Sequence, residues 1–442
     1  MPLPAFSMKA FILNLSLLMT LSITVRSSNE DATRINDDLT LLSYSNQTIY
    51  ANKRICPCRP LCSRGTGFIN PICWGIPSLR YRYQWSNDNI GDIHSCLYSL
   101  FMQIKGQQRA IETLVGHINR KLYDPRASFL IHLAGDNGVG KTMSAALLSI
   151  AISLYPHKAH RNAGETLLII SGSEFASVSG DSAEERQLVT RQIQSRLVTH
   201  VQKFSKCVVL FDEVTQMHPV LLQELNPLFS AIEHGESING VPMTGVFCFL
   251  TSDFGSNGKT LGMTSTEVRT LVWEVIQETY KYTPALKKAN VIPFLALSPA
   301  DYQDAIRYRL NTLKCQHNKK NSLFGNTNIN ILEFTFDEEV LVDFLYCKIL
   351  SGIPQRNGRE IDRIFDDYIE GPLVMKLAEF EMCASEKSTS TGGSRESNLW
   401  EYLFLGSSSI DVSVSFLVVN STETQGLDKK LVIEVLLDQR KH

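Results

Sequence analysis

Short apolar runs alternate with longer stretches of helical spacing through the middle of the chain. The apolar runs have the length of strands and lie at 127–134, 166–170, 207–211 and 246–251. Between them, apolar residues recur every three or four positions, which is the period of a helix that buries one face. Strands that alternate with helices predict a parallel sheet with helices on both faces. We therefore predict an α/β domain over residues 93–298.

The pattern changes twice after this domain. Residues 299–385 keep mainly helical spacing, which predicts a small helical domain. A Ser/Thr/Gly-rich segment at 386–398 has the composition of a flexible linker. Residues 399–442 are rich in β-branched residues and predict a β-rich segment that contains a pair of strands.

Residues 1–27 have the order of a secretory signal peptide. Lys9 precedes an apolar run at 10–25, and small residues follow it. A membrane anchor is the alternative, but the run contains polar residues and is shorter than the roughly 20 residues that cross a bilayer. We therefore predict cleavage near Ser27 and a protein of the endoplasmic reticulum lumen or the secretory pathway. A plastid-type organelle reached by the same route is the alternative.

Residues 28–92 form a polar and then cysteine-rich segment. Four of the ten cysteines lie close together in it, at Cys56, Cys58, Cys62 and Cys73. Their spacing does not match the paired CxxC of a structural zinc site, so we predict disulfides, whose connectivity stays open. Two glycosylation sequons, at Asn46 and Asn420, would be used if the chain enters the lumen.

Composition adds few constraints. Hydrophobic residues make up 43% of the chain, charged residues 20%, and the formal net charge is −2. These values are ordinary for a globular protein, and they give no basic surplus of the kind that predicts a nucleic-acid partner.

A phosphate-binding loop follows the first apolar run. The motif G-x4-G-K-[ST] is matched by Gly135, Asp136, Asn137, Gly138, Val139, Gly140, Lys141 and Thr142. Its glycines let backbone N–H groups surround phosphates at the start of a helix. Lys141 would contact the β- and γ-phosphates, and Thr142 would offer its hydroxyl to Mg²⁺. We therefore predict a site for ATP and Mg²⁺.

A second motif ends the apolar run at 207–211. Asp212 and Glu213 follow this run, about 70 residues after the glycine-rich loop. An aspartate at this place can hold Mg²⁺ through water, and a glutamate beside it can polarise the attacking water. We predict that Asp212 binds the metal and that Glu213 is catalytic.

With both motifs in place, the chain resembles AAA+ ATPases, in particular the torsins and the related Clp-type unfoldases, from about Leu97 to Leu373. Gly106 and Gln107 are similar to the G-Q motif, whose neighbourhood contacts adenine in the family. Arg359, in the triplet 357–359, is similar to the sensor 2 arginine, so the resemblance implies a catalytic contact with the γ-phosphate. The helical region 299–385 would then be the lid of the nucleotide site, and the protein would be a homo-oligomer.

The chain departs from the family pattern in three ways. Asp253 stands where the sensor 1 asparagine is expected, and a carboxylate beside phosphates disfavours normal hydrolysis. Lys288 stands nearest to the Clp arginine finger, and a lysine cannot make the same bidentate contact. The stretch 176–203, where Clp unfoldases carry an aromatic pore loop, contains no Phe, Tyr or Trp.

These features support three functional hypotheses. The leading one is a torsin-like lumenal ATPase that remodels proteins or membrane-linked assemblies and depends on a lumenal membrane-protein activator to supply an arginine. The second is an ATP-switched scaffold with weak hydrolysis, which Asp253 favours. The third is a Clp-like unfoldase or chaperone with a protein substrate.

Overall fold

The structure is a computed structural model, and it describes residues 58–63, 90–160, 162–178, 181–253, 262–317, 329–350, 357–390, 410–420 and 429–437. The predicted signal peptide, the sequon at Asn46 and the cysteines at 56 and 73 lie outside these residues. Within the described part of the chain, no helix combines the length and the apolar character of a membrane span.

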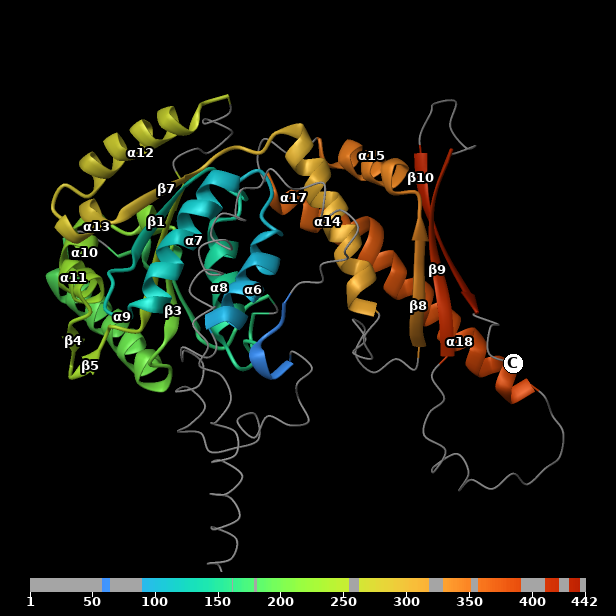
Figure 1. Ribbon diagram of the computed structural model, residues 1–442, viewed down its shortest axis with the longest axis horizontal. Coiled ribbons are helices and arrows are strands. Elements are labelled where there is room, and N and C mark those ends of the chain that lie inside the picture. The colour runs from blue at the N-terminus through green and yellow to red at the C-terminus, as the bar shows by residue number, and fades with distance from the viewer. Residues whose placement is uncertain are drawn as a thin grey trace, which may run out of the picture. The chain divides into compact units, whose positions relative to one another are not determined.

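A five-stranded sheet forms the first domain, and all of its neighbouring strands are parallel (Figure 1). The strands are β1 (Leu130–Gly135), β2 (Leu167–Ser171), β3 (Cys207–Asp212), β6 (Val246–Asp253) and β7 (Asn290–Phe294), in the spatial order β2-β3-β6-β1-β7. The four apolar runs in the sequence correspond to β1, β2, β3 and β6. The predicted α/β domain with a parallel sheet is therefore confirmed.

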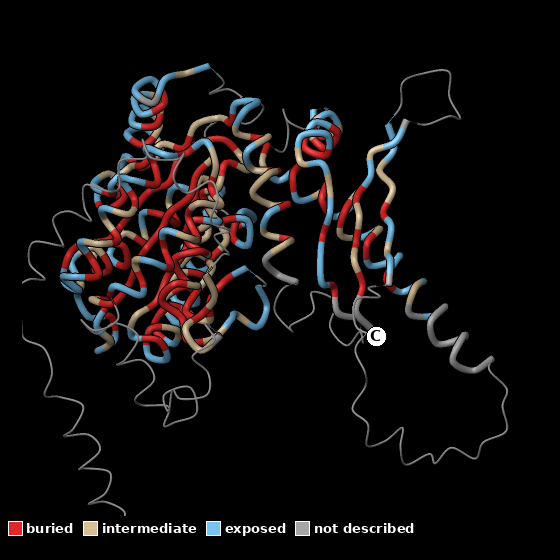
Figure 2. Tube along the Cα trace, turned by 45° about the vertical axis from the view of Figure 1, so that its right-hand side comes forward, coloured by how far each residue is buried: buried red, intermediate tan, exposed pale blue. Residues whose placement is uncertain are grey.

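Helices cover both faces of this sheet. Their bounds are α6 (Ile90–Phe101), α7 (Gln108–Tyr123), α8 (Lys141–Ile152), α9 (Ala183–Lys203), α10 (Pro219–Glu224), α11 (Asn226–His234), α12 (Ser265–Thr279) and α13 (Pro284–Lys288). Helices α6, α7 and α8 share one hydrophobic cluster with Leu133 and Leu210, and helices α9 to α13 share another with Ala134 and Phe211. Neighbouring residues of one strand thus pack on opposite faces, because side chains alternate along a strand. The three central strands, β1, β3 and β6, are buried along almost their whole length, whereas the edge strands β2 and β7 are partly accessible (Figure 2).

The C-terminal region combines helices with a second sheet. It contains α14 (Pro299–His317), β8 (Ile329–Phe336), α15 (Glu338–Ile349), α17 (Arg359–Phe365), a π-helical turn (Asp366–Glu370), α18 (Gly371–Ser390), β9 (Ile410–Asn420) and β10 (Lys429–Leu437). Strands β9 and β10 are antiparallel, which confirms the predicted strand pair, and β8 adds a third strand parallel to β9. Val412, Val414 and Phe416 of β9 pack into the same core as the helices.

Two sequence-based expectations for this region were incomplete. The segment 299–385 was expected to be helical, but β8 interrupts the helices. Helix α18 continues to Ser390, five residues into the predicted linker 386–398. Glu386 and Lys387 are good helix formers, and their propensity extends the helix into a segment that composition alone assigned to a linker.

Candidate nucleotide-binding site

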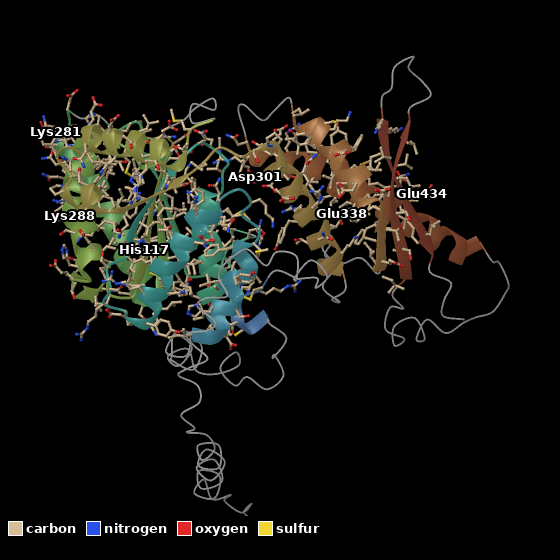
Figure 3. The ribbon with its side chains drawn as sticks, turned by 45° about the horizontal axis from the view of Figure 1, so that its top comes forward. His117, Lys281, Lys288, Asp301, Glu338 and Glu434 are labelled. Atoms are coloured by element: carbon tan, nitrogen blue, oxygen red, sulfur yellow. A yellow bond between two sulfur atoms is a disulfide. The ribbon has the colours of Figure 1, made fainter. Side chains whose placement is uncertain are left out.

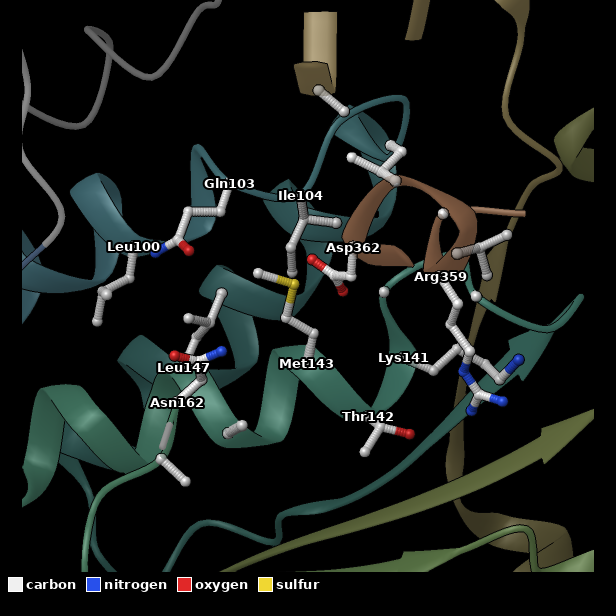
Figure 4. Close-up of a pocket in the computed structure, with 18 of the residues that line it drawn as sticks. Leu100, Gln103, Ile104, Lys141, Thr142, Met143, Leu147, Asn162, Arg359 and Asp362 are labelled. Atoms are coloured by element: carbon white, nitrogen blue, oxygen red, sulfur yellow. The ribbon is translucent and has the colours of Figure 1, made fainter. Parts of the chain in front are cut away.

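A cavity of about 580 Å³ lies between the glycine-rich loop, the ends of β3 and β6, and the lid helices α14 and α17 (Figure 4). Residues 137–142 of the loop line it, together with Asp212, Glu213, Asp253 and Arg359. Residues far apart in the sequence therefore meet in one cavity.

The glycine-rich loop needs glycine where it turns into α8. Gly140 has a φ of 103°, and a Cβ atom there would lie 2.9 Å from the side chain of Ile104. Gly138, with a φ of 72°, also adopts the left-handed conformation that glycine allows without strain. Helix α8 begins at Lys141, directly after this turn. The loop and the start of α8 therefore form one concave backbone surface of the kind that binds phosphates.

Lys141 lies inside the loop. Its ammonium group donates hydrogen bonds to the carbonyl oxygens of Gly135 at 2.8 Å and Asp136 at 2.5 Å, and the residue is 8% exposed. Burial lowers the pKa of Lys141 to about 8, and the negative charge of Asp253 opposes this most. A cation in so dry a place gains more from a nearby phosphate than an exposed lysine would.

One carboxylate oxygen connects the two predicted motifs. Oδ1 of Asp212 accepts hydrogen bonds from the hydroxyl of Thr142 at 2.8 Å and from the hydroxyl of Thr251 at 2.6 Å. Hydroxyl and carboxylate oxygens are ligands that Mg²⁺ accepts, so Thr142 and Asp212 fit the metal role predicted for them. Thr251 lies on β6, and sequence reasoning missed it because its contact depends on the pairing of β3 with β6.

Glu213 lies beside this pair. Its backbone N–H donates to the hydroxyl of Thr251 at 2.8 Å, and its φ is 55°, which is unusual for a residue with a side chain. Oε2 of Glu213 accepts a hydrogen bond from the amide of Gln216 at 2.5 Å. The backbone position of Glu213 is therefore tied to Asp212 through Thr251.

Asp253 and Arg359 reach the cavity from opposite sides. Asp253 ends β6 and is level with Gly135 at the end of β1. Arg359 begins α17 and lies next to Lys141 (Figure 4). Its positive charge contributes to the lowered pKa of Lys141. The cations of Lys141 and Arg359 therefore line the same cavity as the carboxylates of Asp212, Glu213 and Asp253.

The lid contacts the glycine-rich loop directly. The backbone N–H of Gly358 donates to the carbonyl of Gly138 at 3.1 Å, and the amide of Asn357 donates to the carbonyl of Asn137 at 2.8 Å. Oδ1 of Asn357 accepts from the hydroxyl of Tyr302 on α14 at 3.0 Å. The sequence pointed to Arg359 in this segment and gave no separate role to Asn357.

Gly106 and Gln107 have a different position from the one expected. Neither lines the cavity, although the neighbouring residues 103–105 do. The side-chain amide of Gln107 makes two hydrogen bonds to the backbone of Leu295, at 2.7 Å and 2.9 Å. A Cβ atom at Gly106 would lie 2.7 Å from the carboxyl carbon of Asp301. Both residues therefore fix the segment that leads into the lid.

A disulfide holds the cysteine-rich segment against the cavity. Cys58 is bonded to Cys96 of α6, and residues 58–60 line the cavity. Backbone hydrogen bonds from Leu61 to Ser153 at 2.9 Å and from Cys62 to Leu154 at 3.0 Å attach the segment to the residues that follow α8. Cys62 is also disulfide-bonded. The predicted use of these cysteines in disulfides is thus confirmed for the ones that the structure describes.

Lys288 lies elsewhere. It is exposed at the end of α13 and is not among the residues that line the cavity. Figure 3 shows it with Lys281 at the edge of the first domain, remote from Asp301, where the lid begins. Its side chain is therefore open to a second molecule.

Comparisons with known proteins agree with this architecture. Residues 131–238 match the family model described as AAA domain (dynein-related subfamily). The chaperone protein ClpB of Mycoplasma pneumoniae is 26% identical over 300 residues, which are 63% of this chain and 36% of ClpB. A closed-state structure of Hsp104 with ATPγS and FITC casein has a TM-score of 0.51 at 16% identity, and the match covers 79% of this chain and 52% of that one.

These comparisons support the α/β AAA fold, and they show that residues 131–238 are similar to AAA domains and that the chain is similar in sequence to the Clp-type chaperone ClpB. The chain spans about a third of the length of ClpB. The resemblance to torsins stays a prediction from the sequence.

Proposed function

We propose that this protein binds ATP with Mg²⁺, hydrolyses it, and uses the energy to remodel proteins. The similarity of the chain to ClpB supports this proposal. The observation that carries the proposal is the shared oxygen of Asp212. It brings the hydroxyl of Thr142, at the end of the glycine-rich loop, to the carboxylate that ends β3. Lys141 and Arg359 line the same cavity.

Each residue has a role that its position supports. Lys141, from the glycine-rich loop, and Arg359, from the lid, neutralise the charge of the β- and γ-phosphates. Thr142 and Asp212 would hold Mg²⁺, which supplies further charge neutralisation when bound. Glu213 orients the attacking water, and its attachment to Thr251 keeps it at the metal-binding end of the site.

A Clp-like remodelling activity has more support than the torsin-like one. ClpB is a chaperone, and the Hsp104 structure contains casein, so a protein substrate is the natural proposal. The stretch 176–203 contains no Phe, Tyr or Trp, and we therefore propose remodelling that does not grip a threaded chain with such side chains. Disulfides at Cys58 and Cys62 fit an oxidising compartment, which supports the proposal of a lumenal protein.

One observation favours a second candidate, a nucleotide-switched scaffold with weak hydrolysis. Asp253 lies level with Gly135 at the end of β6 and lines the same cavity as Lys141, so a carboxylate stands where the resemblance leads us to expect a neutral amide. A negative charge at this place opposes the charge that develops on the phosphates.

Three variants test the proposal on the full chain. Lys141→Ala should abolish ATP binding, because it removes the cation held in the glycine-rich loop, whereas Lys158→Ala, at an exposed lysine, should not change it. Glu213→Gln should bind ATP but lose turnover. Turnover of the wild type is measured with and without casein. Undiminished binding by Lys141→Ala would refute the site, and equal turnover by Glu213→Gln would remove Glu213 from catalysis.

A further inference from the structure

Strand β10 forms one edge of the second sheet. Among the described strands it pairs with β9 alone, so one of its two sides carries backbone N–H and C=O groups that no described strand uses (Figure 1). Such a row can pair with a strand of another molecule, and proteins prevent this with a proline, a bulge or a central charge. β10 contains no proline, its register with β9 is unbroken, and its middle, residues 431–433, is Leu-Val-Ile. The edge is therefore suited to pairing.

The two faces of this sheet differ. One face packs into the core with the helices, and Ile433 of β10 is only 7% exposed there. The other face carries aliphatic side chains that remain accessible, with Leu417 at 43%, Val419 at 41% and Leu436 at 57% exposure. Val432 lies directly opposite Leu417 on this outer face. A further strand beside β10 would cover part of this apolar surface.

Two charges on the outer face of β10 have no counterpart in their own sheet. Lys430 lies opposite Val419, and Glu434 lies opposite Ser415, so neither faces an opposite charge on β9. Four residues of extended chain separate the two, which is about 14 Å along a strand, so they cannot pair with each other. Both side chains are exposed, and neither forms a salt bridge with another described residue. Each charge is therefore available to a second molecule.

β10 is complementary to itself in one antiparallel register. In a pair with two-fold symmetry, residue i of each strand faces residue j of the other. An axis at Val432 places Lys430 of each molecule opposite Glu434 of the other, on the same face of the sheet. An axis one residue earlier or later would place Lys430 opposite Val432 or Leu436 instead. The first of these registers joins opposite charges, and symmetry makes it do so twice.

We propose that β10 is the docking site for a second copy of this chain, which pairs with it antiparallel about Val432 and joins the two second sheets into one continuous sheet. Opposite charges directly across two antiparallel strands stabilise the pairing, and like charges destabilise it. The Lys430–Glu434 pairs therefore select this register as well as this partner. The proposal is independent of the proposed ATPase activity, because no residue of β10 lines the nucleotide cavity.

Sedimentation velocity on the full chain tests the proposal. Asn420 ends the neighbouring strand β9, so any glycan is first removed with a glycosidase. The wild type should associate at low ionic strength and dissociate on dilution or added salt, because both ion pairs are exposed. Lys430→Glu and Glu434→Lys should each weaken association by on the order of 10- to 100-fold, since each turns two attractions into two repulsions.

The double variant Lys430→Glu/Glu434→Lys is the decisive one. It exchanges the two charges and should associate like the wild type. Lys429→Glu makes the same change of charge one residue away, on the other face and opposite Val435 of the second molecule, and should weaken association much less. Hydrogen exchange measured by mass spectrometry locates the contact: the β10 amides should exchange more slowly at high protein concentration, and Lys430→Glu should lose this protection.

Three results would overturn the proposal. The first is a wild type that stays monomeric at every concentration. The second is association that Lys430→Glu leaves unchanged, which would assign it to other surfaces. The third is a double variant that fails to associate although its circular dichroism is native, because the two charges would then not face each other.

Discussion

The backbone N–H of Gly358, at the start of lid helix α17, donates a hydrogen bond to the carbonyl of Gly138 in the glycine-rich loop at 3.1 Å. The approach is so close that a Cβ atom on Gly358 would lie 2.4 Å from that oxygen. The lid and the loop therefore touch through their backbones, and Arg359 follows directly after the contact. The position of this arginine therefore depends on the absence of a side chain at Gly358, which allows the two backbones to approach so closely.

Gly358→Ala should separate the lid from the loop. The added methyl group must displace α17 and with it Arg359, and a misplacement of about 1 Å at a catalytic group costs on the order of 10²-fold in rate. Steady-state ATP turnover measures this loss. Gly116→Ala on α7 is the matched control, because no atom lies within 4 Å of its added Cβ and alanine favours a helix. Wild-type turnover in Gly358→Ala would show that the contact does not position Arg359.

Asp253→Asn should raise the basal turnover of the isolated protein. The change removes the carboxylate that most strongly opposes the lowering of the Lys141 pKa, and it supplies an amide donor. One positioned donor in such a site changes the rate of turnover by on the order of 10²- to 10³-fold. Lys288→Ala should leave the rate unchanged, because Lys288 is exposed and outside the cavity.

The opposite results would be equally informative. Slower turnover in Asp253→Asn would mean that the carboxylate itself takes part in hydrolysis. Turnover that is lost in Lys288→Ala would show that this lysine acts on the site of a neighbouring subunit.

Removal of the Cys58–Cys96 disulfide should lower the stability and weaken nucleotide binding together. The bond spans 38 residues, and loss of a cross-link over a loop of this size costs about 2–4 kcal/mol. Because residues 58–60 line the cavity, their release also exposes the wall of the site. Urea unfolding and ADP titration of Cys58→Ser and Cys96→Ser measure both effects. Cys347→Ser, at an exposed free thiol, is the control and should change neither quantity.

Acid should destabilise the protein partly through His132. Burial, helped by the charge of Lys141, lowers the pKa of His132 to about 3 from 6.5. The folded state then binds fewer protons than the unfolded state between these two values, so this contribution to stability is present above pH 6.5 and is lost as the pH falls towards 3. The slope for one such group is at most about 1.4 kcal/mol per pH unit.

The variant His132→Gln tests this assignment, because glutamine can keep a hydrogen bond to Ser252, which lies 2.7 Å from Nε2 of His132. Urea unfolding at several pH values should give a shallower slope for the variant. Other histidines with lowered pKa contribute to both proteins, so the difference between the slopes isolates His132. Equal slopes would contradict the prediction.

The sequence predicted the strands that are buried on both faces. β3 and β6 read as unbroken apolar runs because helices cover them on both sides. β8 was missed because polar residues such as Asn330, Glu333 and Thr335 interrupt its pattern. Its place in the sheet depends on pairing with β9, some 80 residues later in the chain.

The site divides in the same way. Lys141, Thr142, Asp212 and Glu213 belong to local motifs, and the structure brings them into one cavity. The contact of Asn357 with Asn137 joins residues 220 positions apart, and no local pattern marks it. Asp362 likewise belongs to no motif, and only the fold shows that it lines the cavity together with Ile104.

Asn420 closes strand β9, opposite Lys429 of β10, and it is also the first residue of a glycosylation sequon. A sugar attached there would stand at the end of the three-stranded sheet and keep neighbouring molecules away from it. In a glycosylated protein, any ring of subunits would then have to assemble through other surfaces. Attachment of a glycan to Asn420 would therefore restrict the surfaces through which subunits can assemble.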